Sequence, residues 1–216
     1  MGYTYCISDI HGELDRLLAL LLQIQFQPED RLYILGDVID RGPQGLEALA
    51  LILDTPNITL LRGNHEQMCL DTLGHNPRFG TKALWRENGG HRTYRDLLYR
   101  TPPAQRRRLL QALAQTPDHL ELTVNHRPFY LVHGYPSHDP HTRLWGRPQP
   151  GHPAPIPGVT CIVGHTPTCF LHGKYEHPLE IWHGEGIVDI DCGCGHPSQL
   201  RRLACLRLED FAAFYV

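Results

Sequence analysis

The sequence has no apolar segment long enough to cross a membrane. Its longest apolar run, LLALLLQI after Arg16, is far shorter than the roughly 18 residues that a membrane-spanning helix needs. The first residues also lack the basic region, apolar segment and cleavage site of a signal peptide. We therefore expect a protein of the cytoplasm that has no membrane partner.

The sequence also lacks an excess of charge of one sign. Its formal net charge at pH 7 is −3, so the composition gives no reason to expect nucleic acid as a ligand. Lysine is scarce, because Lys82 and Lys174 are the only lysines among 20 basic residues. Seven cysteines, an odd number, indicate reduced thiols and exclude a simple disulfide framework.

The length and composition fit one globular domain that covers residues 1–216, with 41% hydrophobic and 20% charged residues. In the first third of the chain, apolar strand patterns alternate with helical patterns. The predicted strands are Tyr3–Ser8, Arg31–Leu35 and Ile58–Leu61, and the predicted helices start near Leu14 and span Pro43–Leu53 and His65–Leu73. This alternation predicts right-handed crossovers and a sheet that helices cover.

The rest of the chain changes from helices to strands. Residues 78–115 are expected to be mostly helical, with Gly89 closing a helix at WRENGG. The later strand candidates are LELTV, FYLVH, TCIVGH, LEIWH, GIVDIDCG and RRLACLRLE. Residues 135–158 contain seven of the 18 prolines and predict a long irregular loop. We therefore expect an α/β (α+β) protein in which two packed sheets share one core.

Polar side chains follow five of the strand candidates, where ligand sites form in α/β sheets. The five segments are SDIHG, GDVIDRG, RGNHE, VHG and GHT. Any one of these residues alone could be a helix cap, a core histidine or a surface ion pair. Their occurrence in order after successive strands instead indicates a single site.

Their side chains suit two cations. Asp9 and His11, two residues apart on a strand end, can bind one ion, and Asp37 can bridge it to a second. The second ion would bind Asn64, His133 and His165. Mixed oxygen and imidazole ligands suit Mn, Fe or Zn better than Ca.

The order of these motifs resembles the metallophosphoesterase superfamily, and within it the phosphoprotein phosphatase family with its phage and bacterial serine/threonine phosphatases. The resemblance covers the whole chain and implies a calcineurin-like four-layer αββα sandwich. It implies two divalent metal ions, with manganese expected and Fe or Zn as alternatives. The implied ligands are Asp9, His11 and Asp37 on one ion and Asp37, Asn64, His133 and His165 on the other.

The same resemblance implies the remaining roles. Arg41 and Arg62 would bind the phosphate, and His65 would be the general acid for the leaving oxygen. Asp40 would hold the imidazolium of His65. A further phosphate-binding arginine would be Arg147, with Arg143 as the alternative.

Two positions depart from the family pattern. Ser8 occupies the position of a glycine, and Cys192 occupies that of a threonine.

The expected function is hydrolysis of phosphoserine and phosphothreonine in proteins by a two-metal phosphomonoesterase that uses a metal-bridging hydroxide. The partner would be a phosphoprotein or phosphopeptide. Two alternatives remain: a hydrolase of dinucleoside polyphosphates such as diadenosine tetraphosphate, which would take a nucleotide substrate, and a catalytically inactive metal-binding regulatory scaffold.

Overall fold

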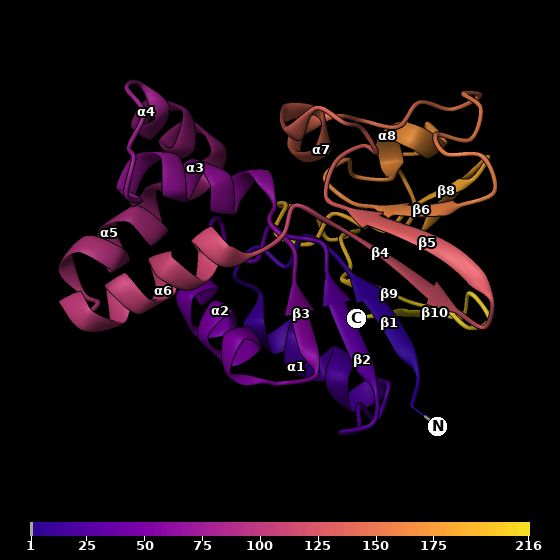
Figure 1. Ribbon diagram of the computed structural model, residues 1–216, viewed down its shortest axis with the longest axis horizontal. Helices are drawn as coiled ribbons and strands as arrows, with labels where there is room; N and C mark the ends of the chain where they lie inside the picture. The colour runs from indigo at the N-terminus through magenta and orange to yellow at the C-terminus, as the bar shows by residue number, and fades with distance from the viewer. Residues whose placement is uncertain (1) are drawn as a thin grey trace.

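The computed structural model describes residues 2–216, whose strands form two five-stranded mixed sheets (Figure 1). The first sheet has the order β10-β9-β1-β2-β3, and the second has the order β4-β5-β6-β8-β7. The first sheet contains β1 (Thr4–Ile7), β2 (Arg31–Ile34), β3 (Ile58–Leu60), β9 (Ala204–Arg207) and β10 (Ala213–Tyr215). The second contains β4 (His119–Val124), β5 (Arg127–Val132), β6 (Thr160–Val163), β7 (Trp182–Gly184) and β8 (Ile187–Asp189).

Helices cover the outer sides of both sheets. Figure 1 shows α1 to α6 gathered beside the first sheet and two short helices, α7 and α8, beside the second. The helices are α1 (Leu14–Gln23), α2 (Gly45–Asp54), α3 (Asn64–Leu73), α4 (Thr81–Trp85), the π-helical turn η1 (Arg86–Gly90), α5 (His91–Tyr99), α6 (Pro103–Gln115), α7 (Pro140–Trp145) and α8 (Cys169–His172). None of the helices within residues 2–216 is long and apolar enough to span a bilayer.

Alternating side chains of the strands divide the core into three layers. Tyr5 and Ile7 of β1 pack under the helices of the first sheet, whereas Cys6 between them faces the second sheet. On β5, Leu131 points into the layer between the sheets and Val132 points to the outer face of the second sheet. The period of two therefore buries both faces of the central strands, as expected for sheets stacked between helices.

Parallel strands in both sheets end at the same side of the molecule. β1, β2 and β3 are parallel neighbours in the first sheet, and β5, β6 and β8 are parallel neighbours in the second. Because the carboxyl ends of parallel strands share one edge, the loops after them converge. The five predicted motif segments are among these loops.

The predicted elements agree with the observed ones except at four places. Helix α8 (Cys169–His172) lies in a part of the chain where the sequence patterns predicted only strands. The loop expected at residues 135–158 contains α7, whose N-cap Asp139 accepts hydrogen bonds from the backbone N–H of His141 and Thr142. Gly89 does not end a helix: its φ of 97° produces a kink, and the helical path resumes in α5. Strands β9 and β10 form an antiparallel pair, of which the sequence patterns identified only the first member.

The layer between the sheets makes a testable contribution to stability. Leu206 of β9 is fully buried there, so we expect Leu206→Ala to lower the free energy of unfolding by about 2–5 kcal/mol. Urea denaturation followed by circular dichroism would measure this change. Leu22 on α1 is the matched control, because its side chain is 78% exposed and Leu22→Ala should change stability by less than about 0.5 kcal/mol. Equal effects of the two substitutions would contradict this assignment of the core.

Candidate functional site

The loops after β1, β2 and β3 interlock through backbone contacts. The backbone N–H of Asp9 donates to the Gly36 carbonyl at 3.2 Å, and that of His11 donates to the Asp37 carbonyl at 2.9 Å. Gly36 has a φ of 100°, and a Cβ atom at this position would overlap the backbone of Gly63 in the loop after β3. Glycine at both positions therefore lets the three loops lie against one another.

The backbone of this region adopts strained conformations at its functional side chains. Ten non-glycine residues in the described part of the chain have a positive φ. Six of them are predicted site residues: Asp9, His11, Asp37, Asp40, Arg41 and His165. Such conformations cost about 1–3 kcal/mol each and persist where the surrounding structure fixes them. Their concentration here indicates that the fold determines the direction of these side chains.

The carboxylate of Asp37 lies at the centre of the site. Its Oδ2 atom is 3.6 Å from His11 Nε2 and 3.4 Å from His133 Nε2. Its Oδ1 atom accepts the backbone N–H of His65 at 3.0 Å. Burial raises the pKa of Asp37, but the charges of His133 and His65 outweigh it and hold the pKa well below its usual value. The carboxylate is therefore ionised in the interior.

Two groups of metal-ligating atoms share Asp37. One contains His11, Asp37 and His65, and the other contains Asp37, His133 and His165. Both remaining predicted ligands lie beside these groups: Asp9 Oδ1 is 3.8 Å from His11 Nε2, and Asn64 Oδ1 is 2.8 Å from His133 Nε2. The structure thus brings all six predicted ligands together around one carboxylate.

The histidines fit divalent ions. His11 Nε2 and His165 Nε2 are buried and have no hydrogen-bond partner among residues 2–216. Burial lowers the pKa of His11 well below its usual value, and burial together with the charge of His133 lowers that of His165 to about 2, so both rings are neutral. The Nδ1 atoms of His11 and His133 lie 3.1 Å and 2.8 Å from the carbonyls of Ile39 and Leu35. On His11, a proton held at Nδ1 leaves Nε2 as the ligand atom. Burial lowers the pKa of His133, but the carboxylates of Asp37 and Asp9 raise it to about 9, so this ring would have to release its Nε2 proton to bind an ion.

His65 belongs to a hydrogen-bonded chain with Asp40 and Trp85. Its Nδ1 atom lies 2.7 Å from Asp40 Oδ2, which also accepts from Trp85 Nε1 at 2.6 Å. Burial lowers the pKa of His65, but the carboxylates of Asp37 and Asp40 raise it above its ordinary value. The arrangement orients the ring and favours the imidazolium form that a general acid requires.

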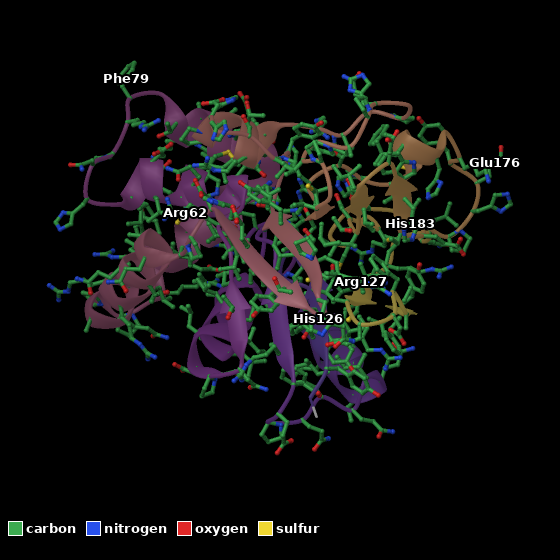
Figure 2. The ribbon with its side chains drawn as sticks, turned by 45° about the vertical axis from the view of Figure 1, so that its right-hand side comes forward. Arg62, Phe79, His126, Arg127, Glu176 and His183 are labelled. Carbon is green, nitrogen blue, oxygen red and sulfur yellow. The ribbon has the colours of Figure 1, made fainter. Side chains whose placement is uncertain are left out.

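The predicted arginines differ in their surroundings. Arg41 contacts the site, since its Nη2 atom is 3.3 Å from His65 Nε2 and its backbone N–H donates to the Gly89 carbonyl. Arg62, labelled in Figure 2, instead donates to the carbonyls of Ala114 and Thr116 at the end of α6. Its guanidinium is thus engaged with α6 in this conformation.

The two alternatives for the further arginine are also distinct. Arg147 is exposed, and its Nη1 atom lies 3.3 Å from Thr166 Oγ1, next to His165. Arg143 donates to Asp118 at 2.7 Å and to the Ser137 carbonyl. Of the two arginines, Arg147 therefore has its side chain beside the loop that carries His165.

Sequence reasoning missed several polar residues that support the site. Glu66 is fully buried and accepts the backbone N–H groups of Asp37, Val38, Ile39 and Gly63. Its signal was present in RGNHE, because a glutamate at the third helical position often reaches back to the residue that precedes the helix.

Three further residues approach the predicted ones. Ser8 donates from its hydroxyl to Asp9 Oδ2. Trp85 lies in the WRENGG segment, where the sequence predicts only a helix end. His196 lies in a glycine-containing loop with no local signal, yet its Nε2 atom is 3.0 Å from Arg41 Nη1.

The sequence is similar to a phosphoesterase family model and to bacterial enzymes that are named as phosphatases. A family model described as calcineurin-like phosphoesterase matches residues 3–169. Serine/threonine-protein phosphatase 2 of Salmonella typhimurium is 33% identical over 181 residues, which are 76% of this chain and 79% of that protein. A symmetrical bis(5'-nucleosyl)-tetraphosphatase of Yersinia pestis is 46% identical over 65 residues, but these are only 29% of this chain and 22% of that protein.

Solved structures share the fold. A protein serine/threonine phosphatase from Saccharomyces cerevisiae superimposes with a TM-score of 0.63 at 14% identity, covering 97% of this chain and 73% of that chain. The two mixed sheets between helices and this similarity confirm the expected calcineurin-like sandwich.

The contacts of Glu66 generate a stability prediction. Each of its oxygens accepts two backbone N–H groups, so the amide nitrogen of Glu66→Gln would face donors instead of acceptors. We expect the substitution to lower the free energy of unfolding by about 2–3 kcal/mol, measured by urea denaturation. Glu47→Gln, at an exposed position in the first turn of α2, is the matched control and should cost less than about 0.5 kcal/mol. A Glu66→Gln protein as stable as the control would exclude this role.

Proposed function

The chain belongs to the calcineurin-like phosphoesterase family, and we propose that it is a two-metal phosphomonoesterase that hydrolyses phosphoserine and phosphothreonine in proteins. The observation that carries the reaction type is the buried Asp37 carboxylate, which two groups of histidines share. The choice of protein substrates rests on the Salmonella serine/threonine-protein phosphatase, whose match covers 79% of that relative.

The fold and its ligand atoms imply divalent metal ions. We propose that Asp9, His11 and Asp37 bind one ion, that Asp37, Asn64, His133 and His165 bind the other, and that manganese is the metal of the active enzyme. When bound, the ions would neutralise phosphate charge and lower the pKa of water.

The other side chains would bind the phosphate and move one proton. Arg41 and Arg147 carry guanidinium groups that suit the oxygens of a phosphate. His65 would donate its Nε2 proton to the leaving oxygen, while Asp40 stabilises the imidazolium through Nδ1. Nε2 now faces Arg41 Nη2, a donor, so Arg41 must turn toward the phosphate for His65 to carry this proton. Arg62 would add a third guanidinium, and to do so its side chain must leave the carbonyls of Ala114 and Thr116.

The second candidate function is hydrolysis of dinucleoside tetraphosphates. The observation that favours it is the 46% identity with the Yersinia tetraphosphatase. Both reactions need the same groups around the scissile phosphate, so the difference must come from residues that contact the rest of the substrate.

Turnover of both substrate classes by manganese-loaded protein tests the proposed function. We expect a phosphoserine or phosphothreonine peptide to be hydrolysed with a higher kcat/KM than diadenosine tetraphosphate, measured as phosphate release and by nucleotide chromatography. A preference for the dinucleotide would replace the first function with the second. A protein that is inert on both with Mn, Fe and Zn would instead indicate a metal-binding scaffold.

The proton donated by His65 generates a second prediction. His65→Asn should lower kcat on a phosphoserine peptide by roughly 10²- to 10⁴-fold, because the serine alkoxide must be protonated as it leaves. The kcat of the same variant on an aryl phosphate with an acidic leaving group should fall much less, because such a leaving group needs little protonation. His126→Asn is the matched control: His126 is exposed at the β4–β5 turn, and its φ of 64° is one that asparagine tolerates (Figure 2). Equal losses on both substrates would argue against a general-acid role.

A further inference from the structure

A wide, open hollow of about 700 Å³ is lined in part by Arg41, and apart from Arg41 none of its lining residues has a role in the proposed reaction. Its walls come from the start of α1, from the loop after β2 that carries Arg41, and from residues 195–201. The cavity is adjacent to the metal-ligand cluster, because Gly195 packs against the ring of His11, where a Cβ atom on the glycine would overlap it.

Positive charge exceeds negative charge in this cavity. Arg16, Arg41 and Arg201 line it, whereas Glu13 is the single acidic residue among the lining side chains. Arg201 Nη1 lies 3.0 Å from Glu13 Oε1, and Arg16 Nη1 donates to the Val216 carbonyl at 2.6 Å. The side chains of Arg201 and Glu13 are 25% and 20% exposed, so the pair remains open to solvent.

His196 links the cavity to the site around the metal ligands. Its Nε2 atom is 3.0 Å from Arg41 Nη1, and the other Nη atom of Arg41 faces His65. Burial and the charges of Arg41, His65 and Arg201 lower the pKa of His196 to about 4. The ring is therefore a neutral acceptor for Arg41 at neutral pH, and it adds no charge of its own to the cavity.

We propose that this cavity binds a carboxylate side chain of the substrate peptide, close in sequence to the phosphorylated residue. This inference rests on the proposed phosphoprotein function. Arg41 would then contact the phosphate from one side, while Arg201 and Arg16 contact the carboxylate. To do so, Arg16 must leave the Val216 carbonyl and Arg201 must leave Glu13.

The lining favours an acidic peptide over a nucleotide. Recognition of a nucleobase commonly uses stacking on aromatic side chains, and the lining contains none. Guanidinium groups match the planar carboxylate of aspartate or glutamate through paired hydrogen bonds. Glu13 competes with a substrate carboxylate for Arg201, so the preference for acidic peptides should be moderate.

Two phosphoserine peptides that differ only by aspartate or asparagine at the flanking positions test the inference on manganese-loaded protein. We expect kcat/KM to be about fivefold higher for the aspartate peptide, mainly through KM, because pairs of this exposure contribute modestly. Arg201→Gln should reduce this ratio to near one and leave turnover of a small aryl phosphate unchanged. Glu13→Gln should raise the ratio, because it frees Arg201 and removes the competing charge.

Arg127→Gln is the matched control for the change in net charge. Arg127 is exposed on β5 beside the β4–β5 turn, away from the strand ends that carry the ligands, so the ratio should stay at the wild-type value (Figure 2). Equal kcat/KM for the two peptides in the wild type would overturn the inference but not the proposed function. An equal fall of the ratio in Arg127→Gln and Arg201→Gln would also overturn it.

Two other outcomes count against the inference. Absence of turnover of either peptide, with hydrolysis of diadenosine tetraphosphate, would overturn the proposed function and the inference together. A larger effect of Arg201→Gln on the dinucleotide than on the aspartate peptide would assign the cavity to the additional phosphates and overturn its assignment to a carboxylate.

Discussion

The ionised carboxylate of Asp37, buried among imidazoles, is the interaction on which the rest of the structure depends. A buried charge is costly unless opposite charges and hydrogen bonds compensate it. The compensation comes from loops after strands of both sheets, so their ends must meet within a few ångströms. The positive φ angles at the site, the contact between Gly36 and Gly63, and the four backbone bonds to Glu66 all fix those loop ends. The two sheets therefore position the loops that surround the Asp37 carboxylate.

Much of the fold could be predicted because its signals are local. Apolar runs followed by glycine and polar residues identified the parallel strands and the loops after them, and these loops carry the proposed ligands. The missed elements are short, and α8, with four residues, is one of them. Helix α7 has six residues and lies in a proline-rich segment whose composition concealed the Asp139 cap and the Pro140 start. Strand β10 has three residues and depends on pairing with β9. Gly89, with a φ of 97°, bends the path between two helical segments, and its carbonyl accepts the backbone N–H of Arg41.

The site was predictable as a set of residues but not as a set of contacts. Motif order selected the six proposed ligands, which the structure brings close together, since each is tied to a strand end. The direction of Arg62 was not predictable, because it depends on carbonyls of Ala114 and Thr116, more than 50 positions away in the sequence. The approach of His196 to Arg41 spans 155 positions and likewise arises from tertiary packing. Sequence patterns identify the residues directly after a strand, whereas the partners of a long side chain depend on the assembled layers.

The proposed ligands divide unequally between the two sheets. Asp9, His11, Asp37 and Asn64 follow strands of the first sheet, whereas His133 and His165 follow strands of the second. Buried side chains between the sheets already hold them together, and an ion bound to residues of both sets would add a cross-link between them. Such a link opposes shear between the layers and couples metal occupancy to heat resistance, because ligands that bind only the folded state stabilise it. The metal ions would then stabilise the packing of the two sheets as well as take part in the reaction.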